Sequence, residues 1–334
     1  MVFCEKSCCR FVACNYFFAM SIAERNAKRR HDREIEGIAA CLLPFEEDGS
    51  IAKEAFQESV RRTEAAGLKC AVNMDTGYAN YLNEDERIQV LDWTREALGS
   101  DKPFVAGVFV EGLEGDLIDL YHRGGDQIAA RGGTPILFQT TRFHDWAADE
   151  IVDLYAKVCA PYEAVLGFEL GEIFAPNGMI YSEEIVSGLM RIPSLKGMKH
   201  SSLSRDEELK RLALRDEIRP DFRIYTGNDL GIDMIEYGSD YLLGLAAFCP
   251  EKFAERDRLW REGDEAYYEL NGALQYLGNV AFRPAVPAYK HSCAVFQHLL
   301  SRIPSSEPHP KCPRRPEWEA GILSDCAKRL GYEI

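Results

Sequence analysis

Leu-Lys-Gly-Met-Lys-His-Ser-Ser, residues 195–202, is a short apolar run that ends on a lysine and then turns polar at once. In an extended strand, alternate side chains share a face, so Lys199 lies on the same face as Gly197, at the strand's carboxyl end. Ser204, with Glu207 three residues later, has the form of a capping box and predicts the start of a helix. This stretch therefore predicts a strand that is followed directly by a helix.

The same alternation of strand and helix recurs along most of the chain. The expected strands are 38–43, 70–72, 104–108, 135–138, 164–170, 195–199, 222–226 and 241–246. Helical periodicity begins at Ile51, and further helices are expected at 84–98, 113–130, 146–158, 182–190, 205–218, 230–237 and 250–261. Eight such units in about 225 residues predict an α/β fold of the (β/α)8 TIM-barrel type. A doubly wound open sheet is the alternative, but no Gly-x-Gly-x-x-Gly follows the first strand, which argues against a dinucleotide-binding version.

The pattern divides the chain into three parts. Residues 1–35 are expected to be an N-terminal arm, disordered or helical, and 36–263 to form the barrel. Residues 264–334 are expected to form a C-terminal helical domain, interrupted by the proline-rich link 304–316. The first 19 residues contain a short, interrupted apolar run that makes a poor signal peptide, and Met20 begins a more ordinary N-terminus. The sequence leaves open whether residues 1–19 belong to the native protein.

Composition restricts the class of partner. The formal net charge of the 334 residues is −15 and the isoelectric point is near 5.0, which argues against nucleic acid or an anionic membrane surface as a partner. No apolar stretch approaches the roughly 18–20 residues that span a bilayer. We therefore expect a cytoplasmic protein whose partner is a small molecule.

Eleven cysteines are present, and four of them fall within the first fourteen residues. The other seven are scattered among apolar neighbours, which favours reduced, buried thiols over a disulfide framework. None of the spacings completes a Cys/His set for zinc, so no metal site is expected.

Several short motifs, in order, resemble the dihydrodipicolinate synthase and N-acetylneuraminate lyase family. Residues 37–49 read as a strand, Leu-Pro-Phe and then Asp-Gly, where the family has a strand, Thr-Pro-Phe and Asp-Gly. Residues 197–202 resemble its Gly-Ile-Lys-(Asp/Glu)-(Ser/Ala)-(Ser/Thr), and 226–229 its Ser-Gly-Asp-Asp. The resemblance spans about residues 36–330. It implies a (β/α)8 barrel with C-terminal helices, usually tetrameric, without a metal or nucleotide cofactor, in which Lys199 forms a Schiff base.

The second family motif is altered at the position that meets the substrate. The family reads Gly-Thr-Thr-Gly-Glu, and its hydroxyls and backbone amides hold the carboxylate of a 2-oxo acid. Here Asp75 replaces the first threonine, Thr76 keeps the second, Gly77 is kept, and Tyr78 replaces the glutamate. The resemblance implies that these four residues bind substrate, although an ionised Asp75 would repel a carboxylate unless it turns away or is protonated.

The end of the fifth strand differs as well. The family has Tyr-Asn-x-Pro there, with a proton-shuttling tyrosine and an arginine soon after, but residues 168–178 contain neither. Glu169 or Gly171 falls at the tyrosine position, depending on the gap, so Glu169 and Glu172 are the candidate general bases. Arg142, in the loop after the fourth strand, is a candidate cation for a carboxylate. Asn228, in the Ser-Gly-Asp-Asp-like motif, is a candidate substrate ligand.

Two functions remain open on this evidence. A lysine among apolar neighbours at a strand's carboxyl end has its ammonium desolvated, which lowers its pKa and prepares it to attack a carbonyl. The position of Lys199 therefore predicts a class I aldolase or lyase that acts on a 2-oxo acid or related carbonyl compound. Because the two altered motifs lack the family's residues, we expect that it is not a true dihydrodipicolinate synthase. His200 faces the other way and is not expected to act directly. The alternative is a non-catalytic or regulatory small-molecule-binding barrel that keeps the lysine. The sequence names neither the substrate, the bond cleaved, nor the oligomeric state beyond a dimer or tetramer.

Overall fold

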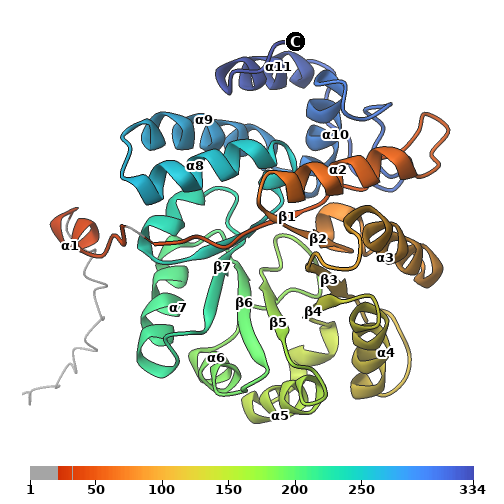
Figure 1. Cartoon of the computed structure of the whole chain (residues 1–334). Coiled ribbons are helices and arrows are strands. Elements are labelled where there is room, and N and C mark those ends of the chain that lie inside the picture. The colour runs from red at the N-terminus through yellow and green to blue at the C-terminus, as the bar shows by residue number, and fades with distance from the viewer. Residues whose placement is uncertain (1–21, 32) are drawn as a thin grey trace, which may run out of the picture.

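The computed structural model describes residues 22–31 and 33–334, so the expectation about residues 1–19 lies outside it. Eight parallel strands close into a barrel in chain order, each hydrogen-bonded to the next and β8 to β1 (Figure 1). The strands are β1 Gly37–Ala40, β2 Lys69–Val72, β3 Phe104–Val108, β4 Gly133–Leu137, β5 Val165–Leu170, β6 Leu195–Ser201, β7 Arg223–Thr226 and β8 Asp240–Leu243. The predicted TIM barrel is confirmed, and the open-sheet alternative is excluded.

Helices surround the barrel on its outside (Figure 1). They are α2 Lys53–Ala65, α3 Glu84–Leu98, α4 Leu117–Ala129, α5 Ala148–Cys159, α6 Glu183–Met190, α7 Arg205–Ile218 and α8 Pro250–Glu262. Short 3-10 turns follow several strands: η1 Asp75–Gly77, η2 Thr141–Asp145, η3 Ile232–Tyr237 and η4 Leu245–Ala247. The helix expected at 230–237 is therefore only the 3-10 turn η3.

Local capping signals account for where helices begin. The Asn83 side chain accepts a hydrogen bond from the Glu86 backbone, and the Glu86 carboxylate accepts one from the Asn83 backbone N–H, which completes a capping box at α3. At α7 the Ser204 hydroxyl accepts from the Glu207 backbone at 3.2 Å, as the sequence predicted for that start. These caps satisfy amides that a first helical turn leaves unpaired.

Two apolar layers follow from the alternation of side chains along the strands. One side of each strand packs against the surrounding helices in the large core. The other side fills the barrel interior, with Ile38, Ala40, Ala71, Met74, Val105, Ile136, Phe138, Leu166, Phe168, Leu170, Tyr225 and Leu242. Because the interior is filled by side chains, open space remains only at the ends of the strands.

Three further helices follow the barrel: α9 Ala266–Ala281, α10 Tyr289–Leu299 and α11 Glu319–Arg329, with the turn η5 Val286–Ala288 ahead of α10. α9 packs on α8 and α11 on α10, and the group lies beside α2 and α8 (Figure 1). Residues 304–316 contain no helix or strand. This arrangement brings a segment that is distant in sequence to the carboxyl end of β2.

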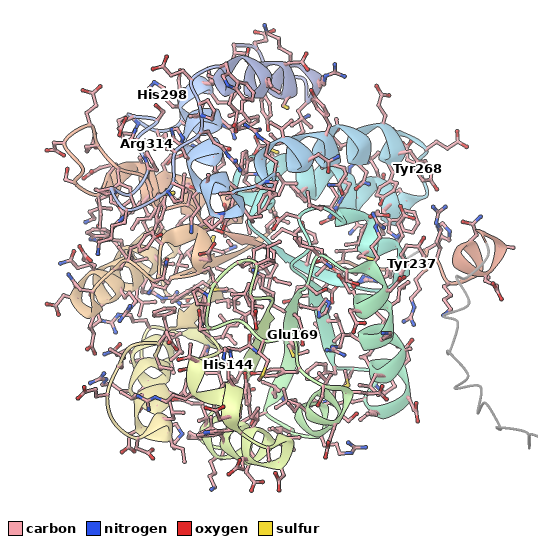
Figure 2. All side chains as sticks on the ribbon, turned by 180° about the vertical axis from the view of Figure 1, so that it is seen from behind. His144, Glu169, Tyr237, Tyr268, His298 and Arg314 are labelled. Atoms are coloured by element: carbon pink, nitrogen blue, oxygen red, sulfur yellow. The ribbon has the colours of Figure 1, made fainter. Side chains whose placement is uncertain are left out.

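The segment that contains α1 Ile22–Ala27 lies against one side of the barrel. Arg29 pairs with Glu236 at 2.8 Å, and Arg33 with Asp240 at 2.7 Å. Figure 2 shows Tyr237 and Tyr268 on the side of the molecule that faces α1. Residues 22–31 and 33–334 contain no helix that is long and apolar enough to cross a membrane. The seven described cysteines are free and buried.

Candidate active site

A pocket of about 490 Å³ opens at the carboxyl ends of β2 to β5. This is the end of a TIM barrel at which its enzymes build their active sites. The wall combines aromatic and aliphatic side chains with two acids, two amides and one lysine. Its lining is Asp75, Ala79, Asn80, Tyr81, Phe109, Glu111, Phe138, Leu170, Phe174, Ala175, Pro176, Asn177, Pro287 and Lys290.

Lys199 lies on β6, and in the ladder it is opposite Phe168 on β5 and Tyr225 on β7. Its side chain is buried, and its Nζ sits 4.5 Å from the centre of the Phe168 ring. No hydrogen-bond partner for this amine is found among residues 22–31 and 33–334. Burial lowers the pKa of Lys199, against the opposing charges of Asp229 and Asp75. The amine is therefore biased toward the neutral form that attacks carbonyls.

Asp229 is the buried acid whose charge acts most strongly on the Lys199 amine. It follows β7, and its Oδ1 accepts a hydrogen bond of 2.7 Å from the Leu245 backbone in η4. Burial raises the pKa of Asp229 to about 7, although the Leu245 hydrogen bond and the charge of Lys199 act in the other direction. Near neutral pH the group is thus poised to give or take a proton.

Gly227 sets how closely the chain after β7 approaches Lys199. A methyl group at this position would lie 2.7 Å from Lys199 Cε and 2.0 Å from the Ser201 hydroxyl. Both separations are shorter than real contacts, so a larger residue would displace the lysine side chain or the loop. The glycine is needed for this close approach rather than for a turn.

Asp75 is paired inside the site. Its Oδ1 accepts from Lys290 Nζ at 2.9 Å, and its Oδ2 accepts from the Tyr289 hydroxyl at 3.0 Å. The Thr76 hydroxyl is 2.8 Å from the same Tyr289 oxygen. The repulsion expected between Asp75 and a bound carboxylate is therefore offset by a lysine from α10.

The other two residues of this turn, Tyr78 and Gly77, do not line the pocket. Tyr78 adopts a left-handed conformation with φ 61°, and its buried ring contacts Phe45 and His309 and lies behind the lining residues Tyr81 and Lys290. Gly77 is buried, and a side chain there would meet the Cys41 carbonyl at 3.3 Å. Of the four residues expected to bind substrate, Asp75 alone lines the pocket, with Thr76 directly behind it.

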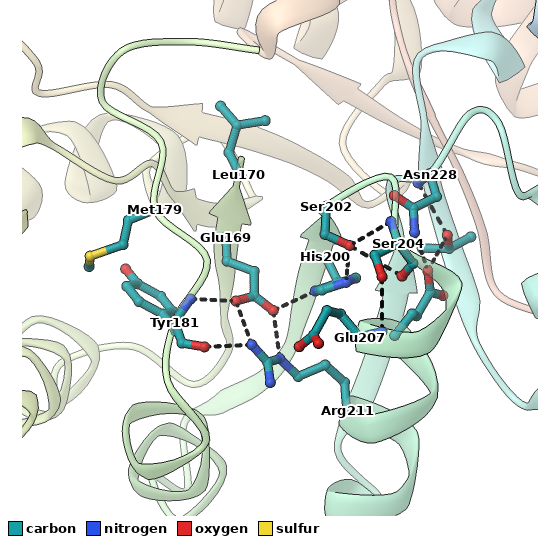
Figure 3. Close-up of polar contacts among 12 residues, drawn as sticks. Glu169, Leu170, Met179, Tyr181, His200, Ser202, Ser204, Glu207, Arg211 and Asn228 are labelled. Carbon is teal, nitrogen blue, oxygen red and sulfur yellow. Dashed lines mark hydrogen bonds and ion pairs between the residues drawn. The ribbon is translucent and has the colours of Figure 1, made fainter. Parts of the chain in front are cut away.

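The expectation that Glu169 faces the barrel mouth is wrong. Its carboxylate is completely buried on the outer side of β5, where it bonds His200 Nδ1 at 2.5 Å and Arg211 Nε at 2.9 Å (Figure 3). It also accepts from the Tyr181 backbone at 2.9 Å. The neighbouring Phe168 points inward instead, so Phe168, rather than Glu169 or Gly171, is the β5 residue beside Lys199. Strand alternation accounts for the difference, because adjacent residues face opposite sides.

Burial alone would raise the pKa of Glu169, but the hydrogen bonds and charges of His200 and Arg211 outweigh it and hold that pKa below its usual value. The carboxylate is therefore ionised and fully engaged. His200 continues the network to the Ser202 hydroxyl at 2.6 Å, which confirms that it faces away from Lys199's side of the strand (Figure 3). This cluster ties β5 and β6 to α7.

The remaining candidates also lie outside the pocket lining. Glu172 is exposed in the loop after β5. Arg142 donates to the Gly115 carbonyl at 2.8 Å and to the Leu113 carbonyl, and so holds the loop before α4. The Asn228 amide donates to the buried Glu208 at 2.8 Å and accepts from the Leu203 backbone at 2.5 Å. Arg142 and Asn228 are therefore each engaged in supporting a loop.

Three solved structures with a similar fold are described as dihydrodipicolinate synthases or as a member of that family. A dihydrodipicolinate synthase from Thermotoga maritima superposes with a TM-score of 0.77 at 18% identity, covering 90% of this chain and 99% of that one. The corresponding enzyme from Agrobacterium tumefaciens gives 0.75 at 21%, covering 89% and 98%. A prophage protein of the same family from E. coli K12, solved with pyruvate, gives 0.76 at 14%, again covering 89% and 98%.

The sequence gives a weaker but independent match. No model of a known protein family matches the chain. The 4-hydroxy-tetrahydrodipicolinate synthase of Synechococcus sp. (strain CC9605) is 25% identical over 211 residues, which are 60% of this chain and 65% of that protein. The chain is therefore similar in sequence to a member of the dihydrodipicolinate synthase family and has the fold of that family's solved structures. The match spans slightly less than two thirds of that curated relative's length.

Sequence reasoning did not identify three residues of the site. Phe168 was missed because the family comparison puts Glu169 or Gly171, depending on the gap, at the tyrosine position. Asp229 belongs to the Ser-Gly-Asp-Asp-like motif at 226–229, which is the sequence signal that could have identified it. Lys290 carried no sequence signal, because it is more than 200 residues from Asp75 and its partnership depends on how α10 docks.

Proposed function

We propose that the protein is a lysine-dependent lyase of the class I aldolase type, which forms a Schiff base between Lys199 and a 2-oxo acid or related carbonyl compound. The observation that carries the proposal is the Lys199 amine itself: buried, unpaired among the described residues and lowered in pKa, at the end of a barrel strand. The similarity to a 4-hydroxy-tetrahydrodipicolinate synthase supports lyase chemistry in general. The chemistry requires neither a metal nor an organic cofactor.

The neutral Lys199 amine attacks the substrate carbonyl carbon, and the carbonyl oxygen takes up a proton to give a carbinolamine. Protonation of its hydroxyl then releases water and leaves the imine, whose positive nitrogen accepts electrons when a bond at the adjacent carbon breaks. Asp229 is the group we assign to donate that proton, because it is buried, fixed by Leu245 and electrostatically coupled to Lys199. Glu169 and Glu172 have no part in this sequence of steps.

Two further properties belong to the proposal. The protein acts in the cytoplasm, as the absence of a membrane-spanning helix in its described residues allows. It assembles as a homodimer or homotetramer, for which the exposed Tyr268 and Tyr276 of α9 offer apolar surface. Exposed aromatic side chains on one helix are a feature of subunit contacts.

Borohydride added in the presence of pyruvate should attach the reduced ligand covalently to Lys199, because borohydride reduces an imine to a stable secondary amine. Peptide mass mapping of the wild type should place the added mass on Lys199, and Lys199→Ala should show none. Lys290 is the informative internal comparison, since it lines the pocket at the carboxyl ends of β2 to β5 and its amine is already engaged by Asp75.

An adduct on Lys290 with Lys199 unmodified would contradict the assignment of the nucleophile. A panel of oxo acids, ketones and aldehydes that gives no adduct would contradict the lyase function. That result would leave the binding-protein alternative, and binding without covalent capture would then be measured by thermal shift.

Asp229→Asn should slow imine formation most at pH 6–7 and less at higher pH. The pKa of Asp229 is raised to about 7, so its acid form is present below that pH and is lost as the pH rises through it. The ratio of wild-type to variant trapping rates should therefore fall between pH 6 and 8.5, from a maximum of roughly 10²-fold or more for a positioned acid. Using this ratio cancels the reagent's own pH dependence. A ratio that stays constant across the range would remove Asp229 from proton transfer.

A further inference from the structure

We propose that Lys290, supplied by α10 from outside the barrel strands, is the cation that selects a carbonyl substrate bearing a carboxylate, and that Asp75 holds it in place. This deepens the proposed function and rests on it, since the selected carboxylate belongs to the compound whose carbonyl meets Lys199. Lys290 would then be a specificity-determining residue in substrate binding.

The charges around the pocket leave one available cation. Its described lining contains two acids, Asp75 and Glu111, and a single basic residue, Lys290. Arg142, the arginine expected to serve this purpose, is committed to backbone carbonyls in another loop. A carboxylate that enters the pocket must therefore meet Lys290 or go without a cation among the lining residues.

Lys290 is held with its charge already desolvated. The residue is 1% exposed, and its Nζ lies 5.5 Å and 5.9 Å from the ring centres of Tyr78 and Tyr81 and 5.7 Å from that of Tyr289. Ring faces attract a cation and compensate part of the lost hydration. Such an ammonium reaches its ligand already positioned, so binding loses little side-chain entropy.

The ammonium also keeps donors to spare. A lysine has three N–H groups, and Asp75 Oδ1 accepts from one at 2.9 Å. The other Asp75 oxygen is taken by the Tyr289 hydroxyl at 3.0 Å, whose own oxygen is 2.8 Å from the Thr76 hydroxyl. Lys290 therefore reaches the pocket with donors to spare, where a carboxylate can be held by charge, while Thr76 and Tyr289 support Asp75 from behind the lining. The opposite wall is apolar, with Phe109, Phe138 and Leu170.

The family motif gains a physical explanation from this arrangement. Where the family has a neutral threonine, this chain has the negative Asp75, which by itself would exclude an anionic substrate. Lys290 restores neutrality to the pair and adds a donor. The substitution and the lysine therefore act as one unit, and each should be tested with the other intact.

The test compares pyruvate with hydroxyacetone, which has the same methyl ketone and carries a neutral hydroxymethyl group in place of the carboxylate. Half-saturating concentrations are taken from borohydride trapping at Lys199. The wild type should favour pyruvate, and Lys290→Met should weaken pyruvate roughly ten- to hundredfold, as expected for a lost charge-assisted bond. Hydroxyacetone should change less than twofold. Lys290→Arg should keep the preference for pyruvate, and Asp75→Asn should increase it.

Lys252→Met is the matched control, since it removes a half-buried lysine that pairs with Glu255 on α8, outside the pocket lining, and should change neither ligand. If Lys290→Met weakens both ligands equally, or if the wild type shows no preference, the inference is overturned. Calorimetric titration with lactate, which has a carboxylate and no carbonyl, separates this result from the Schiff base. Lactate binding lost in Lys290→Met supports the cation's role even if no imine forms, whereas lactate binding that is absent or unchanged contradicts it.

Discussion

Supplied with pyruvate and aspartate semialdehyde, the protein should make dihydrodipicolinate at a rate roughly 10²–10⁴-fold below that of a family synthase assayed beside it, the factor that a positioned proton-transfer group contributes. The residue beside Lys199 on β5 is Phe168, whose ring carries no hydroxyl. No arginine lines the pocket among the residues that the structure describes. The tyrosine that shuttles protons in the family and the arginine that follows it are therefore both missing for that pair of substrates.

The measurement is condensation followed by coupled reduction of the product. Phe168→Tyr is the informative variant, because it places a hydroxyl next to the Lys199 amine with little change in volume. It should raise the condensation rate, although not to that of a true synthase while the arginine is absent. Robust condensation by the wild type would contradict the prediction and would identify the protein as a synthase that uses a different proton relay.

Glu169→Gln should destabilise the fold by about 3–5 kcal/mol, the usual cost of removing one partner from a buried ion pair. The amide keeps the size of the side chain but leaves the buried Arg211 without its counter-charge, as the contacts in Figure 3 indicate. Because the pKa of Glu169 is lowered, its stabilising contribution is complete above the unfolded value of about 4.3 and is lost as the pH falls through the folded value. Urea unfolding at pH 7 and at pH 3–4 should show the difference shrink in acid.

Glu172→Gln is the matched control, because it makes the same substitution three residues after Glu169. Glu172 is exposed, so its free energy of unfolding should change by no more than about 0.5 kcal/mol. Under conditions where the Glu169→Gln variant stays folded, that variant should still form the Lys199 adduct. A variant of unchanged stability that has lost turnover would instead return Glu169 to the chemistry.

The fold could be predicted because its signals are local. The apolar runs and the strand alternation identified the eight strands, and the start of α7 at Arg205 and both ends of β3 agree with the sequence prediction. Where local signals gave out, the prediction was wrong: the segment at 230–237 has the length of a helix but forms the turn η3, where its buried residues pack against β8 and α9.

The site could be predicted only for residues that lie on a single strand. Alternation fixed Lys199 on the inner face and His200 on the outer, and the same rule applied to β5 would have turned Phe168 inward and Glu169 outward. Family resemblance drew attention to Glu169 as a base, but buried charge seeks a partner, and Arg211 and His200 lie on the outer side of β5. Pairing across elements decided what that carboxylate does.

The sequence by itself therefore determined the barrel, the order of its strands and the inward lysine, because these depend on periodicity and on residues close together in the chain. The tertiary structure alone decided the surroundings of that lysine. Burial moves the pKa of Lys199 and of Asp229 in the directions that favour their neutral forms, and it depends on every neighbouring element. The docking of α10 brings Lys290 to Asp75 across more than 200 residues, and no local pattern encodes a contact of that kind.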